Sequence, residues 1–442
     1  MAADQPLRAF GLEPHRVECR AGAGDRAAEP GLRGGPRLSR ECCVTRLTLT
    51  EIGRHGEAIG EKEGRPVYVP YALPGEVVEA EIAGTHAQLR EIVVPSPERI
   101  AAFCPHFTQC GGCQIQHWQS DAYRLWKRGL IVTALKHQGI AVEVEPLIDA
   151  QGEGRRRATL HVNKTAAGVI AGFNAARSHD IHPIDFCPIL VPALASAPEI
   201  ARHIGALLGD CDVAFTASET GIDVDVTTKK KATPSLAALV EAAKLARLSR
   251  NREPLVTRIA PEITAGTARI RLPAGTFLQA TRAGEAALAM LVIENIGKAK
   301  AVADLFCGVG VFALRLAGKA RIFAADSDRG AIAALDEATR KASGLKPVEA
   351  KARDLFREPL VSHELKAFDA VIFDPPRAGA EAQARQLAKS TVKTVVAVSC
   401  DPASFARDAR ILIEGGYRLT RVTPVDQFAF TAHVETVALF RR

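Results

Sequence analysis

The stretch "VADLFCGVGVFAL", Val302 to Leu314, predicts an apolar strand that ends in a glycine-bearing turn and leads into a helix. Gly308 and Gly310 let the backbone approach a ligand closely, and the N-terminus of the following helix favours electron-rich groups. Three further apolar strands continue the alternation with helical patterns: "RIFAAD" (321–326), "DAVIFD" (369–374) and "TVVAVS" (394–399). This alternation predicts a parallel, doubly wound α/β sheet from about residue 262 to the end.

Carboxylates follow the predicted strands at the edge where such sheets bind ligands. Asp326 ends the second strand, from which a carboxylate can grip a ribose hydroxyl pair, and the next two strands add Asp354 and Asp374. Nicotinamide dinucleotide is the competing ligand, but the turn lacks the third glycine of the dinucleotide fingerprint. "DLFCGVG" instead resembles the first motif of class I S-adenosylmethionine methyltransferases. We expect Cys307 in this turn to be a small buried residue beneath the cofactor.

Cys400 lies at the end of the strand in "TVVAVSCDPASFARD", where an open α/β sheet offers side chains to a ligand. In "FDPPRAG" (373–379), Arg377 replaces the aromatic residue of amino-group methyltransferases, which argues against N-methylation. Methylation of pyrimidine C5 requires a thiolate that adds to C6, and then a base that removes the C5 proton. Cys400 supplies a thiol. Glu435, in the otherwise apolar "HVETVALF", supplies a base that would be costly to bury without a role.

Together "DLFCGVGVFAL", "DPPRAG", "VSCDPASFARD" and "HVETVALF" resemble the successive motifs of the bacterial RNA uracil-C5 methyltransferases, the family that forms 5-methyluridine in ribosomal and transfer RNA. The resemblance covers roughly residues 44–442. It implies that Cys400 is the nucleophile and Glu435 the proton acceptor, with Asp374 also reaching the uracil edge. It further implies contacts to S-adenosyl-L-methionine from Gln279, Phe306, Asp326 and Asp374, beside the turn residues Gly308 and Gly310.

Two features depart from the family pattern. Val311 stands where members often carry Asn, which removes one polar contact to the donor. The segment "KASGLKPVEAKARD" lacks the usual asparagines, so Asp354 is assigned only an adenine contact. Neither change affects the covalent chemistry.

A cysteine cluster opens the central part of the chain, in "CPHFTQCGGCQIQHW", and a distant "DFCPIL" adds one more thiol. Cys104, Cys110, Cys113 and Cys187 can ligate a zinc ion or an iron–sulfur cube, or can be reduced structural thiols. Zinc ribbons pair two C-x2-C knuckles, whereas this chain has one knuckle and a solitary Cys-Pro, which favours the cube. The ribosomal branch of the resembled family carries a four-Cys 4Fe-4S site with "CGGCQ", which implies a 4Fe-4S cluster here as fold staple and RNA-docking element.

The chain divides into four predicted parts. Residues 1–43 are rich in Gly, Ala, Arg and Pro and predict a disordered leader. Residues 44–97 alternate in short strands and predict an OB-like β-barrel, and "VPYALPGEVVEAEI" resembles the TRAM domain. Residues 98–261 predict a central α+β domain that carries the cluster. Residues 262–442 predict a seven-stranded class I methyltransferase sheet.

The formal net charge of +7 favours a polyanionic partner. We expect RNA phosphates to contact the basic clusters at 155–157 and 229–231, although a solvated loop is the alternative for the lysine run. No apolar run approaches the length of a membrane span, so we expect a cytoplasmic protein without membrane contact, acting as a monomer.

The sequence leaves the target RNA open. The predicted barrel and cluster favour 23S ribosomal RNA over transfer RNA. The alternatives are a tRNA uridine-C5 methyltransferase and a non-catalytic RNA-binding module, for which neither Cys400 nor Glu435 is needed. A cytosine-C5 methyltransferase is disfavoured by "SCDP" and by the C-terminal glutamate.

Overall fold

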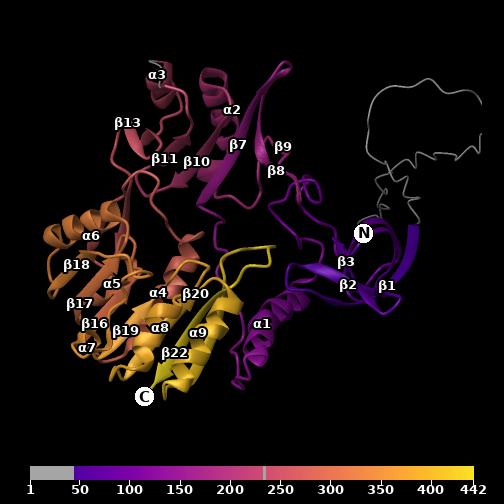
Figure 1. Ribbon diagram of the computed structural model, residues 1–442. Coiled ribbons are helices and arrows are strands. Elements are labelled where there is room, and N and C mark those ends of the chain that lie inside the picture. The colour runs from indigo at the N-terminus through magenta and orange to yellow at the C-terminus, as the bar shows by residue number, and fades with distance from the viewer. Residues whose placement is uncertain (1–43, 232–234) are drawn as a thin grey trace, which may run out of the picture. The chain divides into compact units, whose positions relative to one another are not determined.

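A computed structural model of the chain describes residues 44–231 and 235–442, so the leader predicted for residues 1–43 lies outside the described residues. Its C-terminal half is built on an eight-stranded sheet of order β18-β17-β16-β19-β20-β22-β21-β6 (Figure 1). The strands are β16 (Ala301–Leu305), β17 (Arg321–Asp326), β18 (Val348–Ala352), β19 (Ala370–Phe373), β20 (Thr394–Ser399), β21 (Arg418–Asp426), β22 (Glu435–Arg441) and β6 (Ile148–Asp149).

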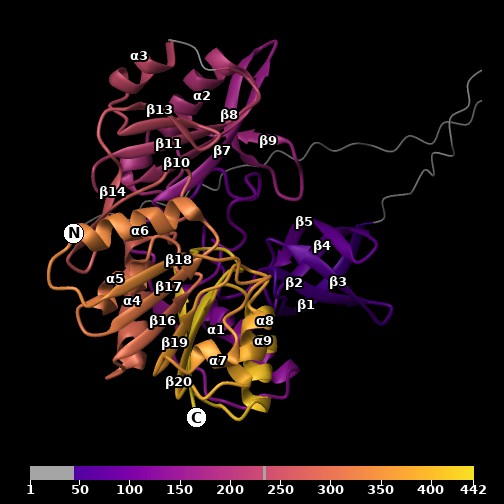
Figure 2. The same cartoon turned by 60° about the vertical axis from the view of Figure 1, so that its left-hand side comes forward.

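The predicted doubly wound sheet is confirmed, because alternate residues of one strand enter two different cores. Val396 and Val398 of β20 belong to one buried cluster, whereas Val395 and Ala397 belong to the cluster on the opposite face. The first face is covered by α4 (Arg282–Ile296), α5 (Val311–Ala317) and α6 (Arg329–Lys341). The second is covered by α1 (Ser120–His137), α8 (Glu381–Ala388) and α9 (Pro402–Glu414), with the short α7 (Ser362–Leu365) nearby (Figure 2).

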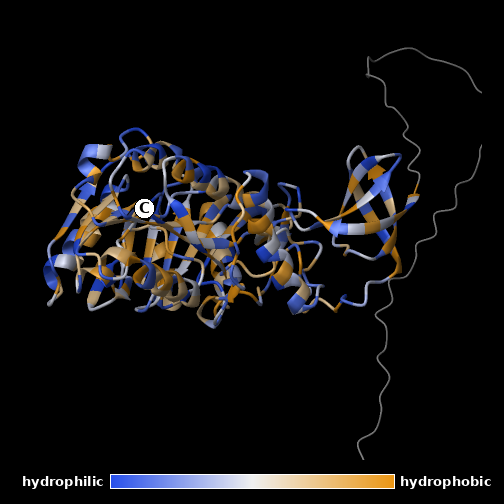
Figure 3. Cartoon of the chain, turned by 90° about the horizontal axis from the view of Figure 1, so that it is seen from below, coloured by the Kyte–Doolittle hydropathy of each residue, from blue (hydrophilic) through white to orange (hydrophobic). Residues whose placement is uncertain are grey.

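Within residues 262–442, all of which the structure describes, the sheet has the seven strands that the sequence predicts. The eighth strand, β6, comes from the predicted central domain and pairs in parallel with the end of β21. The sheet therefore has eight strands in place of the expected seven. Apolar residues, orange in Figure 3, gather on the sheet around the C-terminus, and the surrounding loops and outer helix faces carry most of the blue.

Residues 44–94 form a closed five-stranded barrel of order β1-β2-β3-β5-β4. Its strands are β1 (Val44–Ile52), β2 (Glu57–Lys62), β3 (Arg65–Pro70), β4 (Val77–Ala83) and β5 (His86–Val94). Leu47, Leu49, Val67 and Val69 alternate with exposed or half-buried residues and fill the barrel interior. The alternating sequence pattern therefore gives the barrel that it predicts.

The middle of the chain forms a seven-stranded sheet of order β13-β12-β11-β10-β7-β8-β9. Its strands are β7 (Arg157–Thr165), β8 (Gly168–Asn174), β9 (Ile181–Pro183), β10 (Cys211–Ala217), β11 (Ile222–Thr227), β12 (Arg247–Arg250) and β13 (Glu253–Thr257). The helices η1 (Pro192–Leu194), α2 (Ala197–Leu208) and α3 (Ser235–Ala242) belong to the same region, and a hairpin of β14 (Glu262–Ala265) and β15 (Ala268–Arg271) follows. No helix among the described residues is long and apolar enough to cross a membrane.

Helix α1 belongs to the C-terminal sheet rather than to this middle sheet. Lys127 is fully buried and donates to Asp426 Oδ1 at 2.6 Å, to the Phe428 carbonyl at 2.9 Å and to the His433 carbonyl at 2.5 Å. Tyr123 donates to Asp426 Oδ2 at 2.7 Å and accepts from the backbone N–H of Phe430 at 3.0 Å. α1 and β6 thus lie within the predicted central domain, 98–261, but pack on the C-terminal sheet. The domain division at 97 and 261 stays a prediction.

Replacing Lys127 by Met should destabilise the protein by about 3–5 kcal/mol, because it leaves a buried Asp426 carboxylate without its cation. We expect a clearly lower urea midpoint. The matched control on the same helix is Arg124→Met. Arg124 and its partner Asp149 are both 45% exposed, and such surface pairs contribute about 0–1 kcal/mol. Equal midpoints for the two variants would contradict the role given to Lys127.

Candidate active site

Strand pairing brings the predicted nucleophile and base together at the carboxyl edge of the sheet. β22 runs antiparallel to β20, and Ser399 pairs with Thr436, so Cys400 and Glu435 are neighbours across the pair. Because β22 is antiparallel, it begins at the edge where the parallel strands β19 and β20 end. Asp374 directly follows β19 at the same edge. Residues predicted from separate motifs therefore share one site.

A chain of hydrogen bonds links these carboxylates through two amides. Gln279 Nε2 donates to Asp374 Oδ2 at 3.2 Å. Gln427 Nε2 donates to Gln279 Oε1 at 2.6 Å and to Glu435 Oε1 at 3.0 Å. Gln427 is fully buried, and the sequence reasoning missed it. Its signal was a polar side chain in "VDQF", just before the motif that carries the base.

Burial sets the protonation of all three titratable groups. Burial, together with the charge of Asp374 and against the hydrogen bond from Gln427, raises the pKa of Glu435 to about 8. It raises the pKa of Asp374 to about 7, against the hydrogen bond from Gln279. Burial, together with Glu435 and Asp374, raises the pKa of the Cys400 thiol to about 12, and Arg377 acts in the opposite direction. Perturbed groups gathered at one strand edge are typical of a catalytic site.

Glu435 has one oxygen that is free to take a proton. The residue is 3% exposed, and Oε2 has no hydrogen-bond partner among the residues that the structure describes. A buried carboxylate oxygen without a partner costs free energy unless a ligand uses it. The geometry therefore suits a general base that faces a substrate.

The predicted donor-binding turn has the strained backbone that close approach requires. Phe306, Gly308 and Gly310 have φ of 62°, 53° and 82°. Asp326 Oδ2 accepts from the Gly308 N–H at 2.9 Å, and Oδ1 accepts from the Asp328 N–H at 2.8 Å. Asp326 thus holds the turn at the end of β17, and its contact with ribose hydroxyls stays a prediction.

Two further acids support this turn. Asp354 Oδ1 accepts from the backbone N–H groups of Phe356 and Arg357 at 3.0 and 3.3 Å, and these hydrogen bonds order the loop after Asp354. The ring of Phe356 in this loop lies 5.4 Å from the ring of Phe306 in the turn. Asp304, which the sequence reasoning did not single out, is fully buried and accepts from the Ala313 N–H at 2.9 Å. Burial raises its pKa to about 8. Asp304 therefore anchors the first turns of α5 beneath the glycines.

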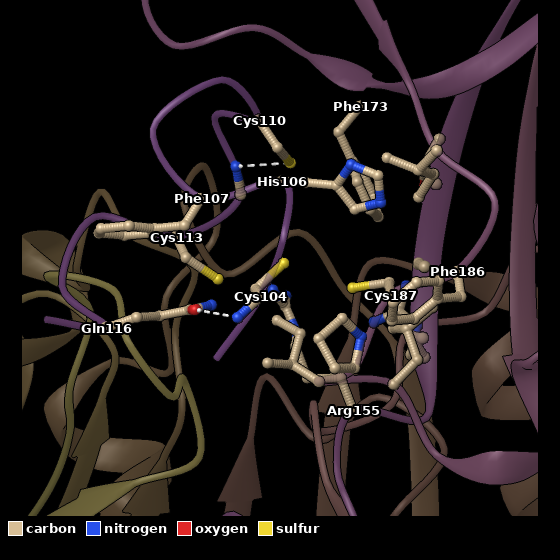
Figure 4. A pocket seen from close by; sticks show the side chains of 18 residues that line it. Cys104, His106, Phe107, Cys110, Cys113, Gln116, Arg155, Phe173, Phe186 and Cys187 are labelled. Carbon is tan, nitrogen blue, oxygen red and sulfur yellow. Dashed lines mark hydrogen bonds between the residues drawn. The ribbon is translucent and has the colours of Figure 1, made fainter. Parts of the chain in front are cut away.

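The four predicted metal-ligating cysteines line one cavity of about 140 Å³. Figure 4 shows the sulfur atoms of Cys104, Cys110, Cys113 and Cys187 turned toward a common space. Among the described residues, no group of three or more His, Cys, Asp or Glu side chains is close enough to hold a single metal ion. The cavity therefore gathers the thiols without forming a compact site for a single ion.

The predicted basic clusters differ in their surroundings. Arg156 is buried, pairs with Glu285 Oε2 at 2.5 Å and donates to the Gln279 carbonyl at 2.9 Å. Arg157 donates to the Leu278 carbonyl at 2.8 Å and lies over the Phe277 ring, whereas Arg155 lines the cysteine cavity. The prediction that all three arginines contact RNA is wrong for Arg156, because this side chain is buried and binds the backbone of the segment that carries Gln279. Lys229–Lys231 are exposed as predicted.

The sequence and fold are similar to those of known RNA methyltransferases. Residues 262–442 match the model of the tRNA (uracil-5-)-methyltransferase family. An uncharacterised RNA methyltransferase of Brucella suis biovar 1 is 47% identical over 90% of this chain and 97% of the relative. The 23S rRNA (uracil(1939)-C(5))-methyltransferase RlmD of Aeromonas hydrophila is 30% identical over 90% of this chain and 96% of the relative. The chain belongs to the RNA uracil-C5 methyltransferase family.

A solved structure agrees with this fold. The tRNA (uracil-54, C5)-methyltransferase of Pyrococcus abyssi in complex with S-adenosyl-L-homocysteine superposes with a TM-score of 0.71, at 23% identity, over 90% of this chain and all of that one. The predicted class I methyltransferase fold of the RNA uracil-C5 methyltransferase family is therefore confirmed. The roles of individual site residues stay predictions.

Gly310→Ala should weaken binding of S-adenosylmethionine by about tenfold or more, because overpacking a core costs about 1–3 kcal/mol. A Cβ at Gly310 would lie 2.4 Å from Leu335 Cδ1. Gly344→Ala is the matched control: Gly344 has a similar φ of 76°, and nothing lies within 4 Å of its added Cβ. Calorimetric titration with the donor compares the two. Equal affinities would show that the turn tolerates a side chain.

Proposed function

We propose that this protein methylates C5 of a uridine in RNA, with S-adenosyl-L-methionine as donor, to form 5-methyluridine. The observation that carries the proposal is the register of β20 and β22, which sets Cys400 beside a buried Glu435 with a free oxygen. RNA binding alone needs neither a strand-end thiol nor a buried carboxylate at this edge. A non-catalytic RNA-binding module is therefore disfavoured.

The reaction requires the target uridine to leave its stack, so that Cys400 can approach C6 from the face of the ring. The Cys400 thiolate adds to C6, and the electrons of the C5=C6 bond move toward the C4 carbonyl. C5 then attacks the donor methyl group, the S–CH3 bond breaks with its electrons staying on sulfur, and S-adenosyl-L-homocysteine leaves. Glu435 removes the C5 proton, the C5=C6 bond re-forms, and the sulfur leaves C6.

The remaining side chains fit this sequence of steps. Arg377 favours the ionised thiolate, since its charge opposes the effect of burial on Cys400. Asp374 follows β19, the strand between β16 and β20, and Gln279 donates to it, which supports contacts from both to the donor and from Asp374 to the uracil edge. We assign further donor contacts to Phe306, Gly308, Gly310 and Asp326, and an adenine contact to Asp354.

We further propose 23S ribosomal RNA as the substrate, and a monomer in the cytoplasm as the acting form. The similarity to the 23S rRNA enzyme of Aeromonas hydrophila extends over 96% of that protein, which supports this target. Transfer RNA is the second candidate, because the matched family model and the Pyrococcus abyssi enzyme are named for it. Mass mapping of 5-methyluridine in both RNAs from a deletion strain decides between them.

We also propose that the cysteine cavity holds a 4Fe-4S cluster, bound by Cys104, Cys110, Cys113 and Cys187. Three buried nitrogen atoms that line it have no hydrogen-bond partner among the described residues: Arg155 Nε, Gln116 Nε2 and His106 Nε2. Cluster and cysteine sulfurs are acceptors for such donors. When bound, the cluster would supply a cross-link within the fold and no step of the methyl transfer.

Substitution of the two catalytic residues should arrest different steps. Cys400→Ala should abolish methylation and leave donor affinity near that of the wild type. Glu435→Gln should still add and methylate, but should accumulate a protein–RNA adduct that survives a denaturing gel. RNA with 5-fluorouridine at the target should trap the same adduct on the wild type, since fluorine cannot leave as a proton. Methylation by Cys400→Ala, or no adduct in either experiment, would rule out the covalent mechanism.

The pH dependence of adduct breakdown should report the Glu435 carboxyl. Only the ionised carboxylate accepts a proton, and burial raises its pKa to about 8. Breakdown of the methylated adduct should therefore speed up about tenfold per pH unit as the pH rises toward 8, and should level off above it. Rapid-quench single-turnover measurements check this profile. A rate that is flat between pH 6 and 9 would exclude Glu435 as the rate-limiting base.

Anaerobically purified protein should be brown and hold about four iron atoms per chain. Cys113→Ser should lose the colour and most of the iron. Cys211→Ser is the control, because Cys211 is a buried free cysteine that does not line the cavity. A colourless wild type with one zinc per chain would decide for the zinc site.

A further inference from the structure

The amide of Gln427 lies between the donor-site amide and the proposed base, and its two N–H groups are both used there. One donates to Gln279 Oε1 at 2.6 Å and the other to Glu435 Oε1 at 3.0 Å. Gln427 Oε1 accepts from the backbone N–H of Thr281 at 3.5 Å. An amide turned the other way would set its oxygen against two acceptors, so these partners fix its orientation.

The surrounding fold is arranged to hold this side chain. The preceding residue, Asp426, is fixed by Lys127 and Tyr123. Gly284, in the first turn of α4, leaves the space that Gln427 fills, because a Cβ there would lie 2.6 Å from Gln427 Oε1 and 2.7 Å from its Cβ. Glycine inside a helix costs about 0.5–1 kcal/mol relative to alanine, and the close contact with Gln427 accounts for its presence.

We propose that Gln427 is a positioning residue for proton transfer: it holds the Glu435 carboxylate through Oε1 and leaves Oε2 as the atom that takes the C5 proton. This inference rests on the proposed function. In the step, the C5–H bond breaks and the proton goes to Oε2. The electron pair re-forms the C5=C6 bond and expels the Cys400 thiolate from C6.

The hydrogen bond from Gln427 also favours the ionised form of Glu435 and lowers its pKa against the effect of burial. The titratable groups that face Glu435 are Asp374 and Cys400, whereas Asp426 on β21 is already paired with Lys127. Removing the Gln427 amide leaves these groups in place. Glu435 should then ionise at a higher pH.

The test is Gln427→Met, which keeps the length of the side chain and removes its donors. With uridine RNA, breakdown of the methylated adduct should be slower by about tenfold or more, since a hydrogen bond to a charged group is lost. The adduct should accumulate on a denaturing gel. The pH of half-maximal breakdown should rise. At saturating donor, trapping of 5-fluorouridine RNA should slow far less than turnover, because that adduct forms before any proton leaves.

Two further variants separate positioning from folding. Gln383→Met is the matched control: Gln383 is also fully buried and makes two hydrogen bonds, to the backbone N–H and carbonyl of Leu360, but lies in α8 outside the site. It should accumulate no adduct. Gly284→Ala should displace an intact Gln427 and slow breakdown in the same direction as Gln427→Met.

Three results would overturn the inference: adduct breakdown by Gln427→Met at the wild-type rate, an unchanged pH profile, or 5-fluorouridine trapping slowed as much as turnover. The last would mean that Gln427 acts before the proton step or only supports the fold. A wild type that fails to trap fluorinated RNA would instead refute the proposed function.

Discussion

The antiparallel pairing of β22 with β20 is the constraint on which the site depends. A parallel strand at this position would begin at the opposite edge of the sheet, and its first residue would lie far from the thiol. The reversed direction lets a strand that starts with Glu435 meet a strand that has just ended before Cys400. The last hairpin of the chain therefore brings the proposed base to the proposed nucleophile, and the preceding parallel strands supply the proposed donor turn and Asp374.

At this edge of the sheet, the neutral amides of two glutamines link the carboxylates of Asp374 and Glu435. Burial raises the pKa of both Asp374 and Glu435, and the charge of Asp374 adds to the rise at Glu435. Gln279 and Gln427 lie between them as neutral donors, each giving an N–H to one carboxylate. A lysine or arginine there would pull the acid pKa values down and weaken the base. Neutral donors orient the carboxylates and leave Glu435 titrating near the pH at which a general base is most effective.

Much of the architecture was predictable, because the strands carry apolar runs ending in functional residues. Cys400, Glu435 and Asp374 could be named from their motifs, since a polar residue at the end of a buried strand needs a reason. Gln427 was harder to name, because its link to the proposed donor site is a hydrogen bond to Gln279, 148 residues away in the sequence. The prediction that the arginines at 155–157 all contact RNA failed for Arg156 for a related reason. A basic run resembles an RNA contact, yet Arg156 finds Glu285 and the Gln279 carbonyl only in the folded chain.

The hairpin of β21 and β22, which carries Glu435, is held by contacts between residues far apart in the sequence. Lys127 and Asp426 are separated by 299 residues, and β6 joins β21 across a similar distance. Contacts of such long range cost loop-closure entropy before they return any stabilisation, and they form late. The donor-binding turn can assemble from local β–α units within the C-terminal half. The hairpin that presents Glu435 is anchored by Lys127 only when the two halves of the chain meet, so we expect the proposed base to be positioned late in folding.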